Sequence, residues 1–423
     1  MAIATHHGSL SEMKKVVWLL CLLLIPAAVR AKVELGVDNF LHNYTSLVRD
    51  KRIGIITNQT GRTGDGRSTL DAVRTVPGVT LAAIFTPEHG LQGTVNAGEK
   101  VLSYFDSAFN APVYSLYGSR RKPSPAMLKG LDALIFDIQD IGVRSYTFIS
   151  TLGLAMQSAG ENGVPFIVFD RPSPLGNRID GNVLDTLYRS FVGRYPLPYV
   201  YGLTIGELAR MINEEGMNGA PCNLTIVPMR GWRRSMTWDQ TGLSWTPPSP
   251  NIPFPSTAVY YAAFGALGEL GIGGYQGIGT RDAFRVFALP NPEGKNFAHL
   301  ILSREIKGLR CIPFDTVVSR QSGSKAFTGV RFILDEQSSG DLAIDGLEVL
   351  SMLTKIHAVS PPDSAHCAMF AKIAGAGYLM RILNGENVLD IEREWTPALI
   401  KYSALRKRYL LYEGDHSDDG AAR

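Results

Sequence analysis

Apolar runs alternate with amphipathic stretches from residue 52 onward. Short runs rich in Ile, Val and Phe are typical of buried strands, and the segments between them repeat apolar residues at helical spacing. The expected strands are residues 53–57, 81–85, 113–116, 133–138, 166–169 and 224–227, and the expected helices are residues 68–76, 146–162 and 204–215. Strands that alternate with helices predict an α/β fold, in which a parallel sheet carries helices on both faces.

A proline-rich stretch, residues 246–255, follows this alternating region and reads as a rigid connector. Beyond it the pattern is mixed. The expected strands are residues 286–289, 311–318 and 329–334, and the expected helices are residues 345–357, 368–383 and 396–411. We therefore expect a first domain over residues 32–255 and a smaller α+β domain over residues 256–423.

The N-terminal residues predict a signal peptide. Lys14 and Lys15 precede an unbroken apolar run at 16–25, and small residues lead up to Ala31. This run is too short to span a bilayer as a stable helix, and the three-part order is typical of export signals. The alternative is a buried N-terminal helix. We expect cleavage after residue 31 and a periplasmic or secreted bacterial protein without a stable membrane anchor.

Charge and motif content exclude several function classes. Without residues 1–31 the chain is close to neutral, which argues against a nucleic-acid-binding protein. No pair of His residues has the spacing of a zinc site, although a metal site made of carboxylates alone is left open. The glycines of residues 271–279 match no nucleotide-binding motif. We expect neither a metal nor a cofactor.

Polar residues follow four of the expected strands. The carboxyl ends of parallel strands meet at one edge of a sheet, where ligands bind. The residues at these ends are Asn58, Glu88, His89, Asp137, Asp140, Arg144, Tyr146, Asp170 and Arg171. A single Asp at a strand end usually caps a turn or a helix. Four such ends that carry Glu, Asp, His and Arg together favour a site for acid–base chemistry at a sugar or a phosphate.

The same strand ends carry a family resemblance. The stretches that match are residues 54–61, 85–90, 113–118, 136–144, 170–172, 231–234 and 248–251. With them the chain resembles the exo-β-N-acetylmuramidase (NamZ-like) family from about Gly36 to Tyr412. The resemblance implies a Rossmann-like catalytic domain, a smaller C-terminal domain and a site in the cleft between them. It also implies a glycoside hydrolase whose substrate is a peptide-free peptidoglycan fragment with a terminal β-1,4-linked N-acetylmuramic acid (MurNAc), such as MurNAc-GlcNAc.

Roles for individual residues follow from this resemblance. The implied catalytic carboxylate is Glu88, and the residues that line the site are His89, Asp137, Asp140, Arg144 and Tyr146. Together with the strand-end pattern, this gives Glu88, His89, Asp137 and Asp140 as catalytic candidates and Asn58, Arg144, Tyr146, Asp170, Arg171, Asn251 and Thr280 as substrate-binding candidates. Residues 277–280 depart from the family pattern because they lack an Arg between two glycines, and Ser173 replaces a common Asn. These departures leave open a non-catalytic peptidoglycan- or sugar-binding protein. A nucleotide-dependent enzyme is disfavoured because no phosphate-binding loop is present.

Chemistry gives Glu88 and the arginines more specific roles. A sugar alkoxide is a poor leaving group, so we predict that Glu88 is a general acid, provided that burial or a nearby Asp137 or Asp140 holds its proton. Arg144 or Arg171 is a candidate partner for the lactyl carboxylate of MurNAc, since Arg binds carboxylates in a bidentate fork. The alternative, equally weighted, is that either Arg pairs with a neighbouring Asp. We predict exo-action at the non-reducing end.

Overall fold

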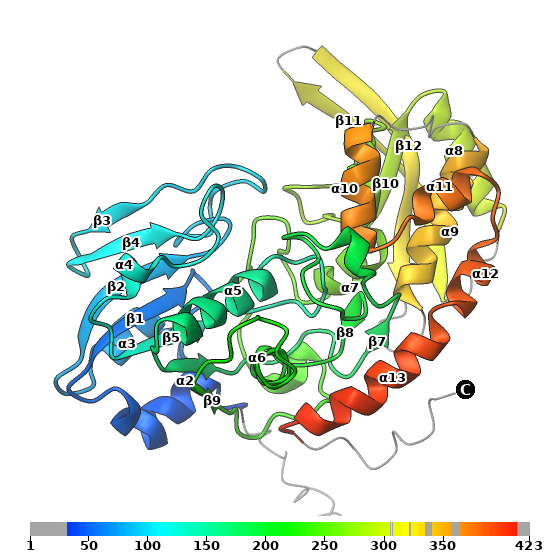
Figure 1. Ribbon diagram of the computed structural model, residues 1–423. Helices are drawn as coiled ribbons and strands as arrows, with labels where there is room; N and C mark the ends of the chain where they lie inside the picture. Colours follow the sequence, from blue (N-terminus) through cyan, green and yellow to red (C-terminus); the bar gives the residue numbers. More distant parts are fainter. Residues whose placement is uncertain are drawn as a thin grey trace, which may run out of the picture. The chain divides into compact units, whose positions relative to one another are not determined.

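The computed structural model describes residues 32–304, 306, 308–320, 323–334, 341–356 and 364–412 (Figure 1). The predicted signal peptide, residues 1–31, lies outside these residues. From Val33 onward the chain forms one compact unit.

A seven-stranded sheet forms the first part of this unit (Figure 1). Its strands are β1 (Arg52–Thr57), β2 (Thr80–Thr86), β3 (Tyr104–Asp106), β4 (Ala111–Ser115), β5 (Ala133–Asp137), β6 (Phe166–Phe169) and β9 (Leu224–Val227), in the order β3-β4-β2-β1-β5-β6-β9. All neighbours pair in parallel except β3 and β4. The predicted α/β, Rossmann-like fold is confirmed.

Apolar side chains on both faces explain why these strands form a central sheet. Ile55 and Ile84 belong to one buried apolar cluster, whereas Ile56 and Phe85, next to them in the chain, belong to the cluster on the other face. Helices α2 (Gly36–Asn39) and α3 (Thr69–Val73) contribute to the first cluster, and α5 (Phe148–Glu161) and α6 (Ile205–Glu214) contribute to the second. Helices therefore cover both faces, as predicted.

The C-terminal part is a smaller α+β arrangement. Its antiparallel sheet has the order β10-β12-β11, with β10 at Val286–Pro290, β11 at Leu309–Arg320 and β12 at Gly323–Leu334. The helices are α7 (Thr257–Phe264), α8 (Glu293–Leu302), α9 (Leu342–Lys355), α10 (Ser364–Ala374), α11 (Tyr378–Leu383), α12 (Val388–Arg393) and α13 (Thr396–Arg406). Its apolar core is continuous with the cluster under α5 and α6. The exact division at 255/256 stays a prediction.

Three smaller features complete the fold. A two-stranded ribbon pairs β7 (Ile179–Asp180) with β8 (Val200–Tyr201), and the short helix α4 (Pro125–Leu128) follows β4. The helix expected over residues 368–383 is wrong as a single element, because the chain turns at Gly375 (φ +69°) between α10 and α11. Across the described ranges, no helix is long and apolar enough to cross a membrane.

Candidate active site at the carboxyl ends of the sheet

A tight turn after β2 fixes Glu88. His89 (φ 73°) and Gly90 (φ 79°) both adopt left-handed backbone conformations, so the chain reverses sharply at the end of the strand. The Glu88 carboxylate accepts a hydrogen bond at Oε1 from the backbone N–H of Gly98 (3.0 Å) and at Oε2 from the hydroxyl of Thr147 (2.7 Å). Three chain segments thus hold one nearly buried carboxylate in place.

Tyr117, at the end of β4, is a further partner of Glu88. Burial raises the pKa of the Tyr117 phenol, and the charge of Glu88 and a hydrogen bond between the two side chains raise it further. The phenol therefore stays protonated and donates to the carboxylate. Tyr117 and Thr147 were not among the sequence candidates, although Tyr117 lies in the matching stretch 113–118 and Thr147 follows Tyr146 directly.

His89 has one ring nitrogen available for chemistry. Its Nδ1 lies 2.7 Å from the backbone carbonyl of Val95, and because a carbonyl only accepts, Nδ1 donates. The neutral ring then presents Nε2 as an acceptor. The backbone N–H of Val95 also donates to the His89 carbonyl (3.2 Å), so two hydrogen bonds join the ends of the loop 89–95.

Asp140 is a second buried carboxyl at this edge of the sheet. Its Oδ2 accepts hydrogen bonds from the backbone N–H of Gly142 (2.7 Å) and from the Tyr201 hydroxyl, whereas its buried Oδ1 has no partner among the described residues. Burial raises the pKa of Asp140 to about 6, against the opposing effect of these donors. A carboxyl that titrates near neutral pH suits acid–base work.

Tyr146 connects the surroundings of the two carboxyls. Its ring meets Phe148 and Tyr261 edge to face, at 4.8 Å and 5.9 Å between ring centroids. Burial raises the pKa of its phenol well above the ordinary value, and a hydrogen bond with the Ser249 side chain lowers it by less. The charges of Tyr261, Asp140 and Glu88 also raise this pKa. The Tyr146 hydroxyl thus lies in the field of both carboxylates, as a neutral donor.

Several buried polar atoms at these strand ends have no hydrogen-bond partner within the part of the chain that the structure describes. They are Asn58 Nδ2, Thr86 Oγ1, Asp140 Oδ1 and Ser173 Oγ. Buried polar groups are normally satisfied, so a cluster of such atoms indicates a place where a polar ligand binds. Hydroxyl and amide groups of a sugar have the donors and acceptors to match them.

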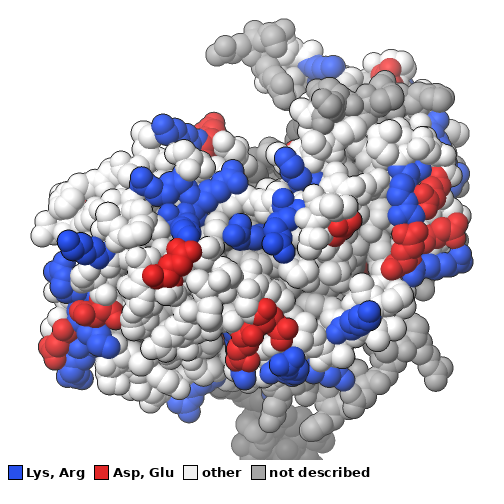
Figure 2. Space-filling model, in the orientation of Figure 1, with Lys and Arg blue, Asp and Glu red and all other residues white. Residues whose placement is uncertain are grey.

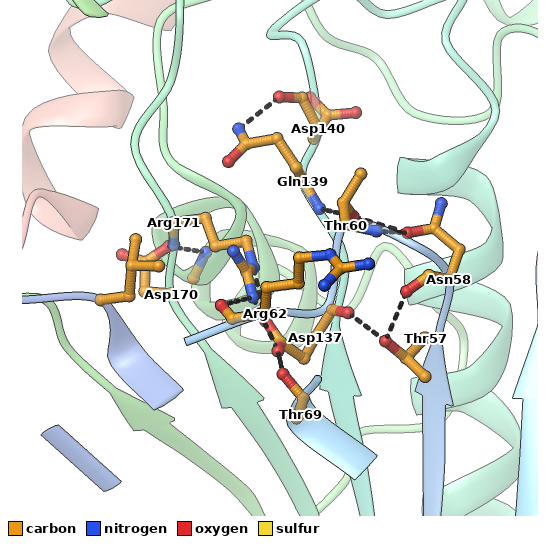
Figure 3. Close-up of polar contacts among 12 residues, drawn as sticks. Thr57, Asn58, Thr60, Arg62, Thr69, Asp137, Gln139, Asp140, Asp170 and Arg171 are labelled. Atoms are coloured by element: carbon orange, nitrogen blue, oxygen red, sulfur yellow. Dashed lines mark hydrogen bonds and ion pairs between the residues drawn. The ribbon is translucent and has the colours of Figure 1, made fainter. Parts of the chain in front are cut away.

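Arg171 and Asp137 form a buried ion pair below this cluster (Figure 3). Arg171 Nε and Nη2 donate to the two carboxylate oxygens of Asp137 at 2.5 and 2.8 Å, and Thr69 donates to the same carboxylate. The alternative that Arg171 pairs with an Asp is therefore confirmed, and direct roles for this pair in catalysis or lactyl binding lack support. Figure 3 shows Asp140 apart from the pair.

Asp170 caps a helix. Its carboxylate accepts the backbone N–H of Gly206 (2.7 Å) and the Thr204 hydroxyl (2.8 Å) at the start of α6, and the Tyr412 hydroxyl from the C-terminal segment. Burial, and then the charge of Glu207, raise the pKa of Asp170 to about 6. With both oxygens engaged and no exposure, Asp170 stabilises the fold, and its expected role in substrate binding lacks support.

Arg144 is fully buried. Its two terminal nitrogens donate to backbone carbonyls, among them those of Asn182 (2.6 Å), Leu197 (2.7 Å) and Ala374 (2.7 Å). Its guanidinium also lies over the Tyr199 ring. These donors are already used to join the sheet region to α10, so the expected role of Arg144 in lactyl binding lacks support.

The remaining two candidates lie in loops. Asn251 is half-buried, and its backbone N–H donates to the Ser249 hydroxyl (3.3 Å). Thr280 is exposed, and its hydroxyl donates to the Gly277 carbonyl (2.7 Å) within its own turn. Neither side chain contacts Glu88 or Asp140 through a hydrogen bond. Within the described ranges, no group of three or more His, Cys, Asp or Glu residues is arranged to hold a metal ion.

Comparison with known proteins identifies this arrangement. The model of the N-terminal region of exo-β-N-acetylmuramidase NamZ matches residues 53–256, and that of its C-terminal region matches residues 259–412. The chain belongs to the NamZ family. The resemblance drawn from the strand-end motifs is confirmed, and membership makes the protein a glycoside hydrolase of this family.

Individual relatives agree with the NamZ assignment. The chain is 38% identical, over 91% of its own length and 92% of the relative's, to the peptidoglycan β-N-acetylmuramidase NamZ of Bacillus subtilis. A crystal structure of a DUF1343 family protein from Bacteroides fragilis superposes with a TM-score of 0.83 at 37% identity, and covers 90% of this chain and 99% of that one. A second such protein from the same organism gives 0.70 at 28% identity, over 91% and 100%.

Proposed function

We propose that the protein removes a single MurNAc residue from the non-reducing end of peptidoglycan fragments, with the disaccharide MurNAc-GlcNAc as its smallest substrate. The observation that carries this proposal is the match to both regions of the NamZ family together with two nearly buried carboxyls, Glu88 and Asp140, at the ligand-binding edge of the sheet. The B. subtilis relative acts on peptidoglycan, which supports the substrate class.

Glu88 is the proton donor in this proposal. Cleavage breaks the bond between C1 of MurNAc and the glycosidic oxygen, and that oxygen takes the Glu88 proton as it leaves. Glu88 is left as a carboxylate after this transfer, and the donors Gly98, Thr147 and Tyr117 orient the group and stabilise that ionised form. A fixed acid loses little entropy on reaching the transition state, which favours catalysis at this position.

Asp140 is the second carboxyl. It is ionised above a pH of about 6 and still has a free Oδ1, so it can accept a proton from the water that completes hydrolysis or stabilise positive charge at C1. The Tyr146 hydroxyl, which lies in the field of both carboxylates, is a donor for the sugar. His89 Nε2 and Asn58 Nδ2 are further sugar contacts.

The experiment compares two disaccharides. The purified protein without the predicted export signal is incubated with MurNAc-GlcNAc and separately with GlcNAc-MurNAc. The products are identified by mass spectrometry. Release of free MurNAc from the first and no cleavage of the second is the expected result. Cleavage of both would contradict exo-action on MurNAc, and binding without cleavage would identify a saccharide-binding protein instead.

Export is part of the same proposal. The basic and apolar residues at 14–31 support cleavage before Lys32 and a site of action outside the cytoplasm, where peptidoglycan lies. N-terminal sequencing of the protein from a native host tests this. A folded cytoplasmic product that still begins at Met1 or Met13 would contradict it.

A further inference from the structure

A stacked arginine lies beside the Glu88 turn, on the loop that follows β4. The Arg121 guanidinium carbon is 4.4 Å from the centre of the Phe191 ring, and the Phe191 ring is 6.0 Å from that of Tyr117. Tyr117 donates in turn to Glu88. A continuous row of side chains therefore leads from the proposed proton donor to a cationic group.

The N–H groups of Arg121 are uncommitted. The side chain is exposed, and within the described ranges it forms no hydrogen bond or ion pair. Stacking on an aromatic face holds the plane of a guanidinium while its edge stays open for a bidentate contact. The next residue along the chain differs, because Lys122 pairs with Glu161 at 2.6 Å.

The segment that carries Phe191 holds two further arginines. Phe191 is held on α5 by a hydrogen bond from the Ser150 hydroxyl to its carbonyl (2.7 Å), and on the same segment Arg189 and Arg194 lie near the Tyr195 hydroxyl. Neither arginine forms an ion pair within the described residues. Figure 2 shows one face of the molecule on which Lys and Arg side chains lie near its middle, with Asp and Glu side chains beside them. Arginines of this kind attract anionic ligands.

MurNAc carries a charge that GlcNAc lacks, the carboxylate of its lactyl ether. Arg144 and Arg171 are both buried, and the terminal nitrogens of Arg144 and the ion pair of Arg171 are engaged inside the protein, so neither serves this group. We propose that Arg121 binds the lactyl carboxylate of the terminal MurNAc and so determines the preference for MurNAc over GlcNAc. This inference rests on the proposed function. The lactyl ether and the scissile bond belong to the same sugar ring, which fits a carboxylate partner that is linked to Glu88 through Phe191 and Tyr117.

The test measures kcat and KM for wild type, Arg121→Gln, Arg121→Lys and Arg120→Gln. One substrate is MurNAc-GlcNAc, and the other is the same disaccharide with its lactyl carboxyl converted to a neutral amide. Arg120 is the matched control, since it is an exposed neighbour of equal charge whose Nη1 lies near the Met127 sulfur (4.0 Å) instead of over an aromatic ring.

We expect Arg121→Gln to lower kcat/KM for MurNAc-GlcNAc by about 10- to 100-fold, chiefly through KM, because a charge-assisted contact to the bound sugar is lost. The amide substrate should respond little to the same change, Arg121→Lys should be intermediate, and Arg120→Gln should resemble wild type.

If Arg121→Gln lowers kcat/KM equally on both substrates, or on neither, the inference is overturned. The proposed function still holds in that case, provided that the wild type releases MurNAc. Equal losses in Arg120→Gln and Arg121→Gln that disappear at high salt would also overturn it, because they would indicate a general field. A wild-type protein that releases no MurNAc overturns the proposed function, and this inference with it.

Discussion

Replacement of Asp140 by Asn should make the protein more stable at alkaline pH while it impairs catalysis. Asp140 Oδ2 receives both hydrogen bonds, from Gly142 and Tyr201, and Oδ1 receives none. An Asn side chain can place its carbonyl oxygen where Oδ2 lies and keep both donors. The substitution then removes a buried charge without removing the contacts that hold the loop.

The magnitude follows from the pKa of Asp140, which burial raises from 3.8 to about 6 in the folded protein. A carboxyl with a raised pKa contributes stability that is present below its unfolded pKa and is lost as the pH rises through its folded pKa. The difference corresponds to about 3 kcal/mol. Because Asn does not titrate, the free energy of unfolding of the variant relative to wild type should increase by about 2–3 kcal/mol between pH 4 and pH 8.

Urea unfolding at pH 4 and pH 8, followed by circular dichroism, measures this change. Asp239→Asn is the control, since Asp239 is exposed on the turn Trp238–Thr241 and should show no comparable pH dependence. Activity on MurNAc-GlcNAc should fall in Asp140→Asn alone. A stability difference between Asp140→Asn and wild type that is the same at both pH values would refute the reasoning about this carboxyl.

Two further predictions concern the buried polar contacts around the sheet. Asp137→Ala leaves the Arg171 charge buried without its partner and should lower the free energy of unfolding by about 3–5 kcal/mol in urea titrations; a loss below about 1 kcal/mol would show that water reaches the pair. Tyr412→Phe removes the hydroxyl that donates to Asp170 and accepts from the Met229 N–H, and should lower the free energy of unfolding by about 1–3 kcal/mol in the same assay. An unchanged unfolding midpoint would contradict this prediction.

The sheet was predictable from sequence because its strands are buried on both faces. Such strands appear as continuous apolar runs, for example Ala133–Asp137, and four of the six expected strands in this region needed only small shifts of their ends. The other two, Phe166–Phe169 and Leu224–Val227, matched at both ends. Strand β3 was missed because it is three residues long, with Tyr104 and Phe105 exposed at the sheet edge, and carries no apolar alternation.

The roles of the arginines were not predictable, since their partners are distant in sequence. Arg144 meets carbonyls of residues 182, 197 and 374, and a sequence pattern does not reveal a carbonyl acceptor. The role of Asp170, by contrast, was predictable, because an Asp at a strand end usually caps a turn or a helix and Asp170 caps α6. The pairing of Glu88 with Thr147 and Tyr117 depends on where two loops cross, which periodicity does not determine.

The most direct test of the central claim compares Glu88→Gln with wild type on two substrates of different leaving-group quality. On MurNAc-GlcNAc the variant should lose about 10²- to 10⁴-fold in kcat, the usual contribution of a general acid. On an aryl MurNAc glycoside with a good leaving group the loss should be much smaller, because that oxygen leaves without a proton. A folded Glu88→Gln protein with near-wild-type turnover of MurNAc-GlcNAc, or with equal losses on both substrates, would contradict the assignment of Glu88 as the proton donor.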